Sequence, residues 1–458
     1  MDKIKSILLK YNSAGPRYTS YPPANFFTES VNNDNYIESL IKSNNEGDSK
    51  LSLYFHIPFC SQLCFFCGCT TQKMRSDDFV SKYIDAIIKE LQSVSEFVNS
   101  NRKVTQIHFG GGTPNAIDFS HLRKIVEKAK ELFVFASDAE IAIECNPAYL
   151  DEERVEQLIE IGFNRFSLGI QDFNENVLKA VNRESSLLNV EELVNIIRKD
   201  GRASVNLDFI YGLPLQTVES FLENIKRAII IKPDRLVTFS YAHVPWVKKA
   251  QQVLEETGLP SSDMKIEMLT KGYQLLLENG YKSIGMDHYA LPTDDLCLAK
   301  EQRSLHRNFQ GYCTKRSTGQ VLAFGASGIS QLHRAYIQNI KNVTKYIDSV
   351  KETGFAIERG YLLADNEIII RECINTLMCN KYLSLQEKAS ELNVSVSELK
   401  EIINFSADSF SEFINDGLVK VEDDCIEVSE NGAFVIRNMA MLIDPMLKTG
   451  DNMYSKTI

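Results

Sequence analysis

Four cysteines within ten residues are the most chemically distinctive feature of this sequence. Cys60, Cys64 and Cys67 have the spacing Cys-x3-Cys-x2-Cys, and Cys69 follows close behind them. They come directly after the apolar run 51–58, which has the length and residue types of a buried strand. Because α/β folds bind ligands at the carboxyl ends of their strands, we expect these thiols to lie at a ligand site.

Three uses of these thiols are weaker hypotheses. We see no signal peptide, so the oxidising compartment that structural disulfides require is not indicated. A zinc site made of the three cysteines and His56 would lack the second, separated pair of ligands that structural zinc loops usually have. A thioredoxin-like pair, Cys64 and Cys67, would leave Cys60 unused.

An iron–sulfur cluster is the use that the spacing favours. Such clusters usually take four thiolates, so three of them leave one iron free to bind a substrate or cosubstrate. Only Gly68 separates Cys67 from Cys69, and Cys69 is therefore poorly placed to reach another corner of the same cluster. We expect Cys69 to lie near the cluster and not on it.

From residue 51 onward the chain predicts alternating strands and helices. Apolar runs typical of buried strands occupy 51–58, 104–109, 139–145, 164–170, 204–212 and 235–242. Helical patterns fall near 78–98, 119–134, 150–161, 186–200, 217–230 and 262–279. The expected helix start signals are Ser76 or Asp77, Asp118, Asp151 and Thr217. This alternation predicts an α/β fold, an incomplete (β/α) barrel of about six parallel strands with its site at their carboxyl ends.

Glycines and polar residues gather at the expected strand ends. Gly110 to Gly112 would let the backbone approach a ligand closely, although a tight loop is the alternative explanation. Single polar residues in such positions are often caps of the next helix. Taken together they predict a shared pocket, in which Glu144 and Asp208 could bind hydroxyl or ammonium groups and Arg183 could pair with a carboxylate.

The rest of the chain predicts an arm and a second domain. We divide the sequence into an N-terminal arm (1–50), the barrel (51–355) and a mainly helical, winged-helix-like C-terminal domain (356–458). Residues 11–24 contain three prolines and one glycine that exclude regular helix, and they fit either an ordered arm or a surface tail. The C-terminal domain has few clustered basic residues, so we expect a lid or docking domain and no DNA binding.

The composition is that of an acidic globular protein. The chain has 458 residues, of which 44% are hydrophobic and 24% charged, and its formal net charge is -11. That charge leaves no basic surplus for phosphates and argues against nucleic acid as the main partner. No apolar stretch approaches the roughly 20 residues of a membrane span, and we expect a cytoplasmic protein.

The cysteine spacing after the first strand, with Phe66 before the last cysteine of the three, resembles the signature of the radical S-adenosylmethionine (SAM) superfamily. Nearly the whole chain resembles one of its families, the oxygen-independent coproporphyrinogen III oxidases, or coproporphyrinogen dehydrogenases, of anaerobic haem synthesis. The stretches that carry this resemblance are Tyr11 to Pro22, Tyr54 to Cys69, Phe109 to Pro114, Asn206 to Pro214, Gly285 to Ala290 and Leu305 to Tyr312. Cys69 and the arm separate it from the related haem chaperones, which have neither.

The resemblance implies a radical oxidative decarboxylation. SAM would bind the open iron of a 4Fe-4S cluster, and one electron would cleave it to methionine and a 5′-deoxyadenosyl radical. That radical would remove a β-hydrogen from a propionate, and the substrate radical would lose one electron and CO2. Two rounds would convert coproporphyrinogen III to protoporphyrinogen IX. The expected partners are the substrate and a low-potential electron donor such as flavodoxin or ferredoxin, and the expected state is a monomer.

The resemblance also assigns residues. Cys60, Cys64 and Cys67 match the cluster ligands, His56 matches a position needed for activity, and Cys69 could shuttle a proton or an electron. The positions that match SAM-binding residues are Tyr54, Phe66, Gly111, Gly112, Thr113, Glu144, Gln171, Arg183, Asp208 and Ala242, with Gln310 and Ile329 near a second SAM. Because arginine suits paired carboxylate contacts, we expect the substrate to be bound by Arg17, Arg303 and Arg307.

Three rival functions predict different observations. A haem-binding chaperone of the same superfamily would carry haem and release no CO2. A tetrapyrrole-directed radical SAM methyltransferase would yield a methylated product and S-adenosylhomocysteine. A zinc-stabilised binding module would be colourless and hold stoichiometric zinc without iron.

Overall fold

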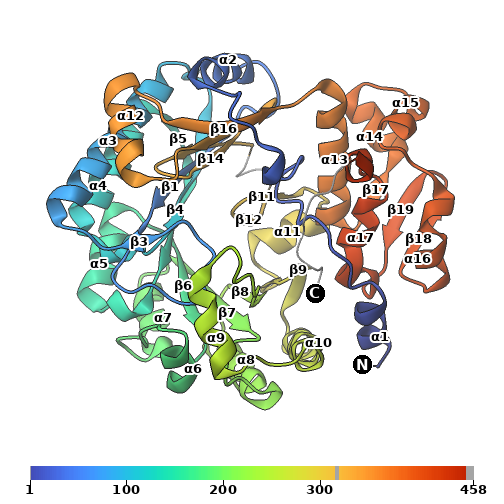
Figure 1. Ribbon diagram of the computed structural model, residues 1–458, viewed down its shortest axis with the longest axis horizontal. Helices are drawn as coiled ribbons and strands as arrows, with labels where there is room; N and C mark the ends of the chain where they lie inside the picture. The colour runs from blue at the N-terminus through green and yellow to red at the C-terminus, as the bar shows by residue number, and fades with distance from the viewer. Residues whose placement is uncertain (1, 315–318, 450–458) are drawn as a thin grey trace. The chain divides into compact units, whose positions relative to one another are not determined.

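The computed structural model describes residues 2–314 and 319–449 (Figure 1). Their contacts divide the chain into two compact units, which we call the sheet unit and the helical unit. The sheet unit comprises residues 28–268 and 319–362, and the helical unit comprises 2–27, 269–314 and 363–449. This division by contacts groups the start of the arm and residues 269–314 with the C-terminal residues. It differs from the three segments expected from the sequence, and their boundaries stay predictions.

Parallel strands form the centre of the sheet unit, in the order β13-β1-β4-β5-β6-β7-β8. Their bounds are β13 (Gln320–Phe324), β1 (Leu51–Ile57), β4 (Lys103–Gly111), β5 (Val134–Cys145), β6 (Arg165–Gln171), β7 (Ser204–Tyr211) and β8 (Arg235–Ser240). All six strands predicted from the sequence are present and parallel, which confirms the predicted fold class. Because β1 pairs with both β13 and β4, it lies inside the sheet and is almost entirely buried.

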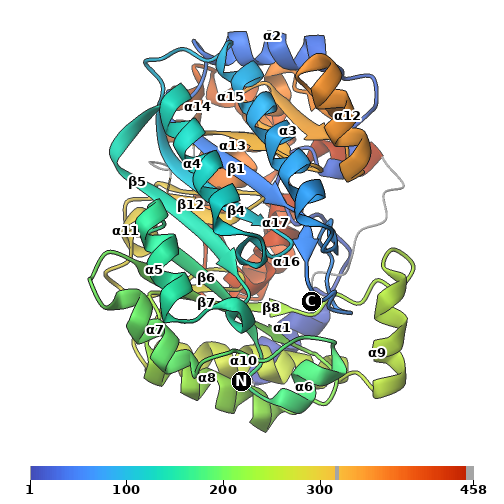
Figure 2. The same cartoon turned by 90° about the vertical axis from the view of Figure 1, so that its left-hand side faces the viewer.

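Helices follow the strands and cover the outer face of this sheet (Figure 2). They are α3 (Asp77–Ser95), α4 (Phe119–Leu132), α5 (Glu152–Ile161), α7 (Val190–Arg198) and α8 (Val218–Ile231). The short helices α6 (Glu175–Ala180) and α9 (Gln252–Thr257) follow β6 and β8, and α10 (Ser262–Glu278) has residues in both units. Three of the expected start signals cap their helices: Asp118, Asp151 and Thr217 each accept a hydrogen bond from a backbone N–H of the first turn. Ser76 precedes α3 without such a bond.

The sheet unit has further elements that the sequence did not predict. An antiparallel extension continues from β13 through β14 (Ile329–Gln331), β15 (Ala335–Asn339) and β16 (Ile357–Leu362). Two more helices are α2 (Asn33–Ser43) and α12 (Val343–Thr353), and short elements are β2 (Phe59–Cys60), β3 (Gln72–Lys73), η2 (Pro114–Ala116), η3 (Pro147–Tyr149) and η4 (Lys249–Gln251). The short helix η1 (Ala24–Phe26) belongs to the helical unit.

The helical unit contains short antiparallel strands among its helices. Its helices are α1 (Asp2–Lys10), α11 (Asp295–Glu301), α13 (Asp365–Asn380), α14 (Leu385–Leu392), α15 (Val396–Ile402), η5 (Ala407–Phe410), α16 (Ser411–Asn415), η6 (Gly432–Val435), α17 (Ile436–Met441) and η7 (Pro445–Thr449). Its strands are β9 (Lys282–Gly285), β10 (His288–Ala290), β11 (Leu305–Asn308), β12 (Gly311–Thr314), β17 (Tyr382–Ser384), β18 (Val419–Glu422) and β19 (Cys425–Val428).

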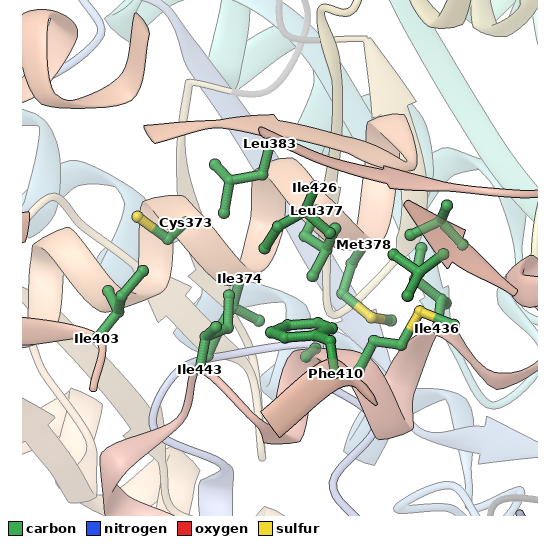
Figure 3. Packing of buried hydrophobic residues seen from close by; sticks show 14 of the residues in the cluster. Cys373, Ile374, Leu377, Met378, Leu383, Ile403, Phe410, Ile426, Ile436 and Ile443 are labelled. Atoms are coloured by element: carbon green, nitrogen blue, oxygen red, sulfur yellow. The ribbon is translucent and has the colours of Figure 1, made fainter. Parts of the chain in front are cut away.

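The sheet β17-β19-β18 and its neighbouring helices give the winged-helix-like arrangement that the sequence predicts. The helix expected over 396–416 is interrupted, because Asn404 adopts a left-handed conformation with φ 50 and ends the first segment. The apolar face of α13 packs into a core shared with β17, β19 and η5; Figure 3 shows Cys373, Ile374, Leu377, Met378, Leu383, Phe410 and Ile426.

The N-terminal residues form an ordered arm, which was one of the two readings left open by the sequence. Tyr11, Tyr18 and Tyr21 are buried in the core of the helical unit. The hydroxyls of Tyr18 and Tyr21 donate to Asp444 at 2.8 Å and 3.0 Å. Buried hydroxyls that are paired in this way hold the arm in one place. Within the described residues no helix is long and apolar enough to cross a membrane.

A buried carboxylate supports the loop that follows β13. Glu90 of α3 accepts hydrogen bonds from the Tyr346 hydroxyl at 2.6 Å, the Asn339 amide at 2.7 Å and the Gly325 N–H at 3.0 Å. Burial raises the pKa of Glu90 to about 7 in spite of these bonds. The same loop is tied to β1, since the Tyr83 hydroxyl donates to the carbonyl of His56.

The raised pKa of Glu90 predicts a pH-dependent stability. Between the ordinary value of 4.5 and about 7, the folded state binds this proton and the unfolded state releases it. Stability should therefore fall as pH rises through that window, by roughly 3 kcal/mol at most. We expect Glu90→Gln to remove this dependence in denaturant unfolding at pH 5 and pH 8, whereas the exposed control Glu96→Gln keeps it. An unchanged pH profile in Glu90→Gln would contradict the assignment.

Candidate active site

The cysteine loop leaves the carboxyl end of β1 and is fixed at both of its ends. Cys60 lies in β2, which pairs with β3 so that Cys60 is opposite Lys73. The Met74 N–H also donates to the carbonyl of Cys60 at 2.8 Å. All ten cysteines of the chain are free thiols, so the disulfide hypothesis finds no support in the structure.

Residues from other strand ends contact the sulfurs. The Thr113 hydroxyl, after β4, donates to Cys60 Sγ at 3.3 Å, and Arg183 Nη1, after α6, lies 3.7 Å from Cys64 Sγ. Burial raises the pKa of Cys60 to about 11 and also raises the pKa of Cys64. Thiolates in this place therefore need a partner such as a metal, which deprotonates a thiol on binding.

Cys69 interacts with Cys67. A hydrogen bond from Cys69 lowers the pKa of Cys67 to about 6, and the same interaction raises the pKa of Cys69 well above its ordinary value. The Lys248 ammonium donates to the carbonyl of Cys69 at 2.9 Å. Cys69 is thus next to the three-cysteine motif, as the sequence predicts, while its role stays a prediction.

His56 and Tyr54 lie side by side at the end of β1. His56 Nε2 is 2.8 Å from the Thr70 carbonyl, which only accepts, so Nε2 carries the hydrogen. Nδ1 then accepts from the Tyr54 hydroxyl at 3.2 Å. Burial lowers the pKa of His56, so the ring is neutral. Because both nitrogens are occupied, His56 is not placed as the fourth zinc ligand that the zinc hypothesis needs.

Across residues 2–314 and 319–449, no group of three or more His, Cys, Asp or Glu side chains is arranged to hold one metal ion. A 4Fe-4S cluster makes a different demand, because each thiolate binds a different iron and the sulfurs lie farther apart.

The glycine turn after β4 brings Glu144 and the cysteine loop together. A Cβ on Gly110 would lie 2.7 Å from the Glu144 carboxylate, and one on Gly112 would lie 2.7 Å from the main chain of Pro58. The Gly112 and Thr113 N–H groups donate to the carbonyls of Ile57 and Phe59 at 2.8 Å and 2.9 Å. The glycines are therefore required by protein contacts before any ligand is considered.

Glu144, at the end of β5, is a charged acceptor that faces the same turn. It accepts from His108 Nε2 at 3.0 Å and from the Gly111 N–H at 3.3 Å. Although partial burial favours the neutral acid, these two bonds lower the pKa of Glu144. Its side chain is 45% exposed, so the ionised carboxylate keeps room for a further donor.

Two neighbouring strands carry acceptors that have no partner among the described residues. Gln171, at the end of β6, has φ 66 and a buried Oε1 without a hydrogen-bond partner among these residues. On β7, Asp208 accepts from the Ser167 hydroxyl at 2.6 Å and from Asn206 Nδ2 at 2.9 Å, while Asn206 Oδ1 is buried and unpaired in the described structure. Buried acceptors of this kind are normally satisfied, so this set of acceptors fits a ligand with ammonium and hydroxyl groups.

Gln251 is a site residue that the sequence did not reveal. It is 1% exposed, and its Nε2 donates to the carbonyls of Phe66 at 3.1 Å and Ala242 at 3.2 Å. Its Oε1 accepts from the Val244 N–H at 2.6 Å. Gln251 thereby ties the cysteine loop to the segment after β8. No local pattern marks it, whereas His108 could have been found from its position two residues before Gly110 on β4.

The remaining predicted residues belong to different parts of the chain. Ile329 begins β14 in the sheet unit. Gln310 lies in the turn between β11 and β12 of the helical unit, and its Nε2 is buried and unpaired within the described residues. Arg17, Arg303 and Arg307 also belong to the helical unit. The roles expected for these residues stay predictions.

The chain is similar to radical SAM proteins and, over nearly its whole length, to coproporphyrinogen III oxidases. The Radical SAM superfamily matches residues 54–228, which include the cysteine loop and the strand ends as far as β7. An oxygen-independent coproporphyrinogen III oxidase from Synechocystis sp. is 37% identical, and the alignment covers 99% of this chain and 97% of the relative. One of the same name from Escherichia coli is 38% identical over 97% of this chain and 95% of its own length.

A solved structure gives the same result. Coproporphyrinogen III oxidase from Escherichia coli, described as a radical SAM enzyme, matches with a TM-score of 0.88 and 35% identity over 96% of this chain and 98% of that one. The similarity extends through both compact units and is not confined to the motif. The chain therefore belongs to the oxygen-independent coproporphyrinogen III oxidase family of the radical SAM superfamily.

Proposed function

We propose that this protein oxidatively decarboxylates two propionates of coproporphyrinogen III to vinyl groups without oxygen, giving protoporphyrinogen IX. The observation that carries the proposal is similarity over 95% or more of the chain to proteins named coproporphyrinogen III oxidase, including the Escherichia coli enzyme of solved structure. Relatives of this kind favour the oxidase over a haem chaperone or a tetrapyrrole methyltransferase. The radical SAM superfamily implies a 4Fe-4S cluster and SAM as cofactors.

The finer proposal for the cluster is ligation by three cysteines. Cys60, Cys64 and Cys67 would hold it, and Thr113 and Arg183 would donate to the sulfurs of the first two. Hydrogen bonds to sulfur and nearby positive charge stabilise the reduced cluster, because they offset added negative charge. When bound, the cluster and SAM supply the radical that removes a hydrogen atom from a propionate.

The acceptors at the strand ends would orient SAM. Glu144 is ionised and would accept from its ammonium group, with Gln171 and Asp208 as further acceptors for ammonium or hydroxyl hydrogens. Tyr54 and the neutral His56 would line the pocket, and Cys69 would be free to move a proton or an electron. Gln310 and Ile329 would contact a second SAM molecule.

The proposed electron donor is a low-potential protein such as flavodoxin or ferredoxin. The protein would act as a monomer in the cytoplasm. The net charge of -11 argues against nucleic acid as a partner.

An anaerobic assay tests the reaction. Reconstituted protein, SAM, a chemical reductant and coproporphyrinogen III should give two CO2 for each protoporphyrinogen IX, with methionine as the product of SAM. Methylated tetrapyrrole with S-adenosylhomocysteine would instead favour the methyltransferase. Tightly bound haem without CO2 release would favour the chaperone.

The three-cysteine proposal predicts unequal effects of two substitutions. Cys64→Ala should remove the cluster, measured as iron content and visible absorbance. Cys69→Ala should retain both, together with SAM binding, while product formation falls about a hundredfold if Cys69 transfers a proton. Loss of iron from Cys69→Ala would mean that four side chains cap the cluster.

The contacts of Gln251 predict a positioning role. Gln251→Ala removes the three hydrogen bonds of a buried side chain, so the segment after β8 should loosen and the dissociation constant of SAM should rise about tenfold. Iron content should not change. The adjacent Gln252 is exposed, and Gln252→Ala is therefore a matched control. Equal SAM affinity in both variants would show that the contacts of Gln251 do not position the ligand.

A further inference from the structure

Arg307 is a buried cation that forms no direct ion pair within the described residues. It lies on β11 with only 6% of its surface exposed, and no carboxylate among the described residues forms an ion pair with it. Its Nη1 donates to the main-chain carbonyl of Arg17, and its Nε is buried with no partner in the described structure. Buried charges are normally paired, because an unpaired one is costly to remove from water.

The surroundings of Arg307 hold its guanidinium in place and leave a surplus of positive charge. Arg307 is directly opposite Tyr312 in the β11–β12 hairpin, and its guanidinium carbon is 5.4 Å from the centre of that ring. Asp287 accepts from His288 Nδ1 at 2.8 Å. Although burial opposes it, this bond and the charges of Arg307 and Arg17 lower the pKa of Asp287. Two guanidinium groups thus act on one carboxylate that is already hydrogen-bonded.

Tyr312 adds a second unpaired polar group. Its hydroxyl is buried and has no hydrogen-bond partner among the described residues. It fits there because Gly285 has no side chain, since a Cβ at that position would overlap the hydroxyl. The His288 ring packs edge-on against Tyr312, with centroids 5.2 Å apart. The Nε of Arg307 and the hydroxyl of Tyr312 are both buried without a partner among the described residues, which indicates a place built for an acceptor.

We infer that Arg307 is the central residue of a carboxylate-binding site in the helical unit, with Arg17 and Tyr312 beside it. A planar guanidinium matches a carboxylate in size and geometry, and it binds more strongly when both are shielded from water. Two ligands of the proposed function carry such a group, the propionates of the tetrapyrrole and the methionine part of SAM. The inference rests on the proposed function for these ligands.

Arg303 does not share this site. It is exposed and stacks over the Tyr382 ring, with its guanidinium carbon 3.7 Å from the ring centre. It lines a separate cavity of about 140 Å³, together with His306 and Lys388. His306 and Arg307 are adjacent in a strand and therefore point to opposite faces. Of the three arginines expected to bind substrate, the structure distinguishes Arg307 from Arg303.

Binding measurements test the site without turnover. The probes are coproporphyrin III, its tetramethyl ester and SAM, with full-length reconstituted protein. If the site holds a propionate, wild-type protein should bind the free acid about tenfold more tightly than the ester. Arg307→Gln should abolish that preference, and Arg307→Lys should retain part of it. If the site holds the carboxylate of SAM, Arg307→Gln should weaken SAM binding by a similar factor and leave the porphyrin preference intact.

The control is Lys420→Gln, at an exposed cation on β18 of the helical unit, which should change neither affinity. If Arg307→Gln does not fold, as judged by thermal unfolding, Arg17→Gln replaces it, because its side chain is exposed. Unchanged affinity for both ligands in the folded variants would overturn the site. That result with normal CO2 release would leave the proposed function standing, whereas wild-type protein that binds both ligands and releases no CO2 would contradict the function alone.

Discussion

The close approach of two chain segments at the ends of β1 and β4 is the constraint on which the site depends. Gly112 has no side chain, so its backbone can lie against Pro58 and donate to Ile57. That contact places the Thr113 hydroxyl against Cys60. It also turns the preceding glycines toward Glu144, since a Cβ on Gly110 would overlap that carboxylate. A single larger residue at Gly112 would separate the cysteine loop from the acceptors that face it.

Much of the fold follows from local sequence patterns. Six strands and the helices between them have their own hydrophobic periodicity, and caps such as Asp151 and Thr217 act within one turn of their helices. β13 was missed because its short apolar run becomes a strand through pairing with β1, which is far away in the sequence. The tyrosines of the arm stayed ambiguous for the same reason, since Tyr18 meets its partner Asp444 across 426 residues.

The candidate site divides in a similar way. The position of Glu144 at a strand end could be predicted, because parallel strands bring their carboxyl ends to one edge. Gln251 could not, because its importance lies in three main-chain partners that no spacing reveals. The distinction between Arg303 and Arg307 also needed the structure, because both are arginines on the same short segment and burial separates them.

The bond between His56 and Thr70 links the two ends of the cysteine loop to one imidazole. His56 precedes the loop on β1, and Thr70 is the residue after Cys69, so the ring bridges the point where the chain enters and the point where it leaves. A shift of Cys69 toward or away from the other cysteines must rotate this ring or break its bond. The same rotation would change the hydrogen bond from Tyr54 to the opposite nitrogen of the ring. The hydrogen bonds Tyr54–His56–Thr70 therefore respond together to the position of the cysteine loop.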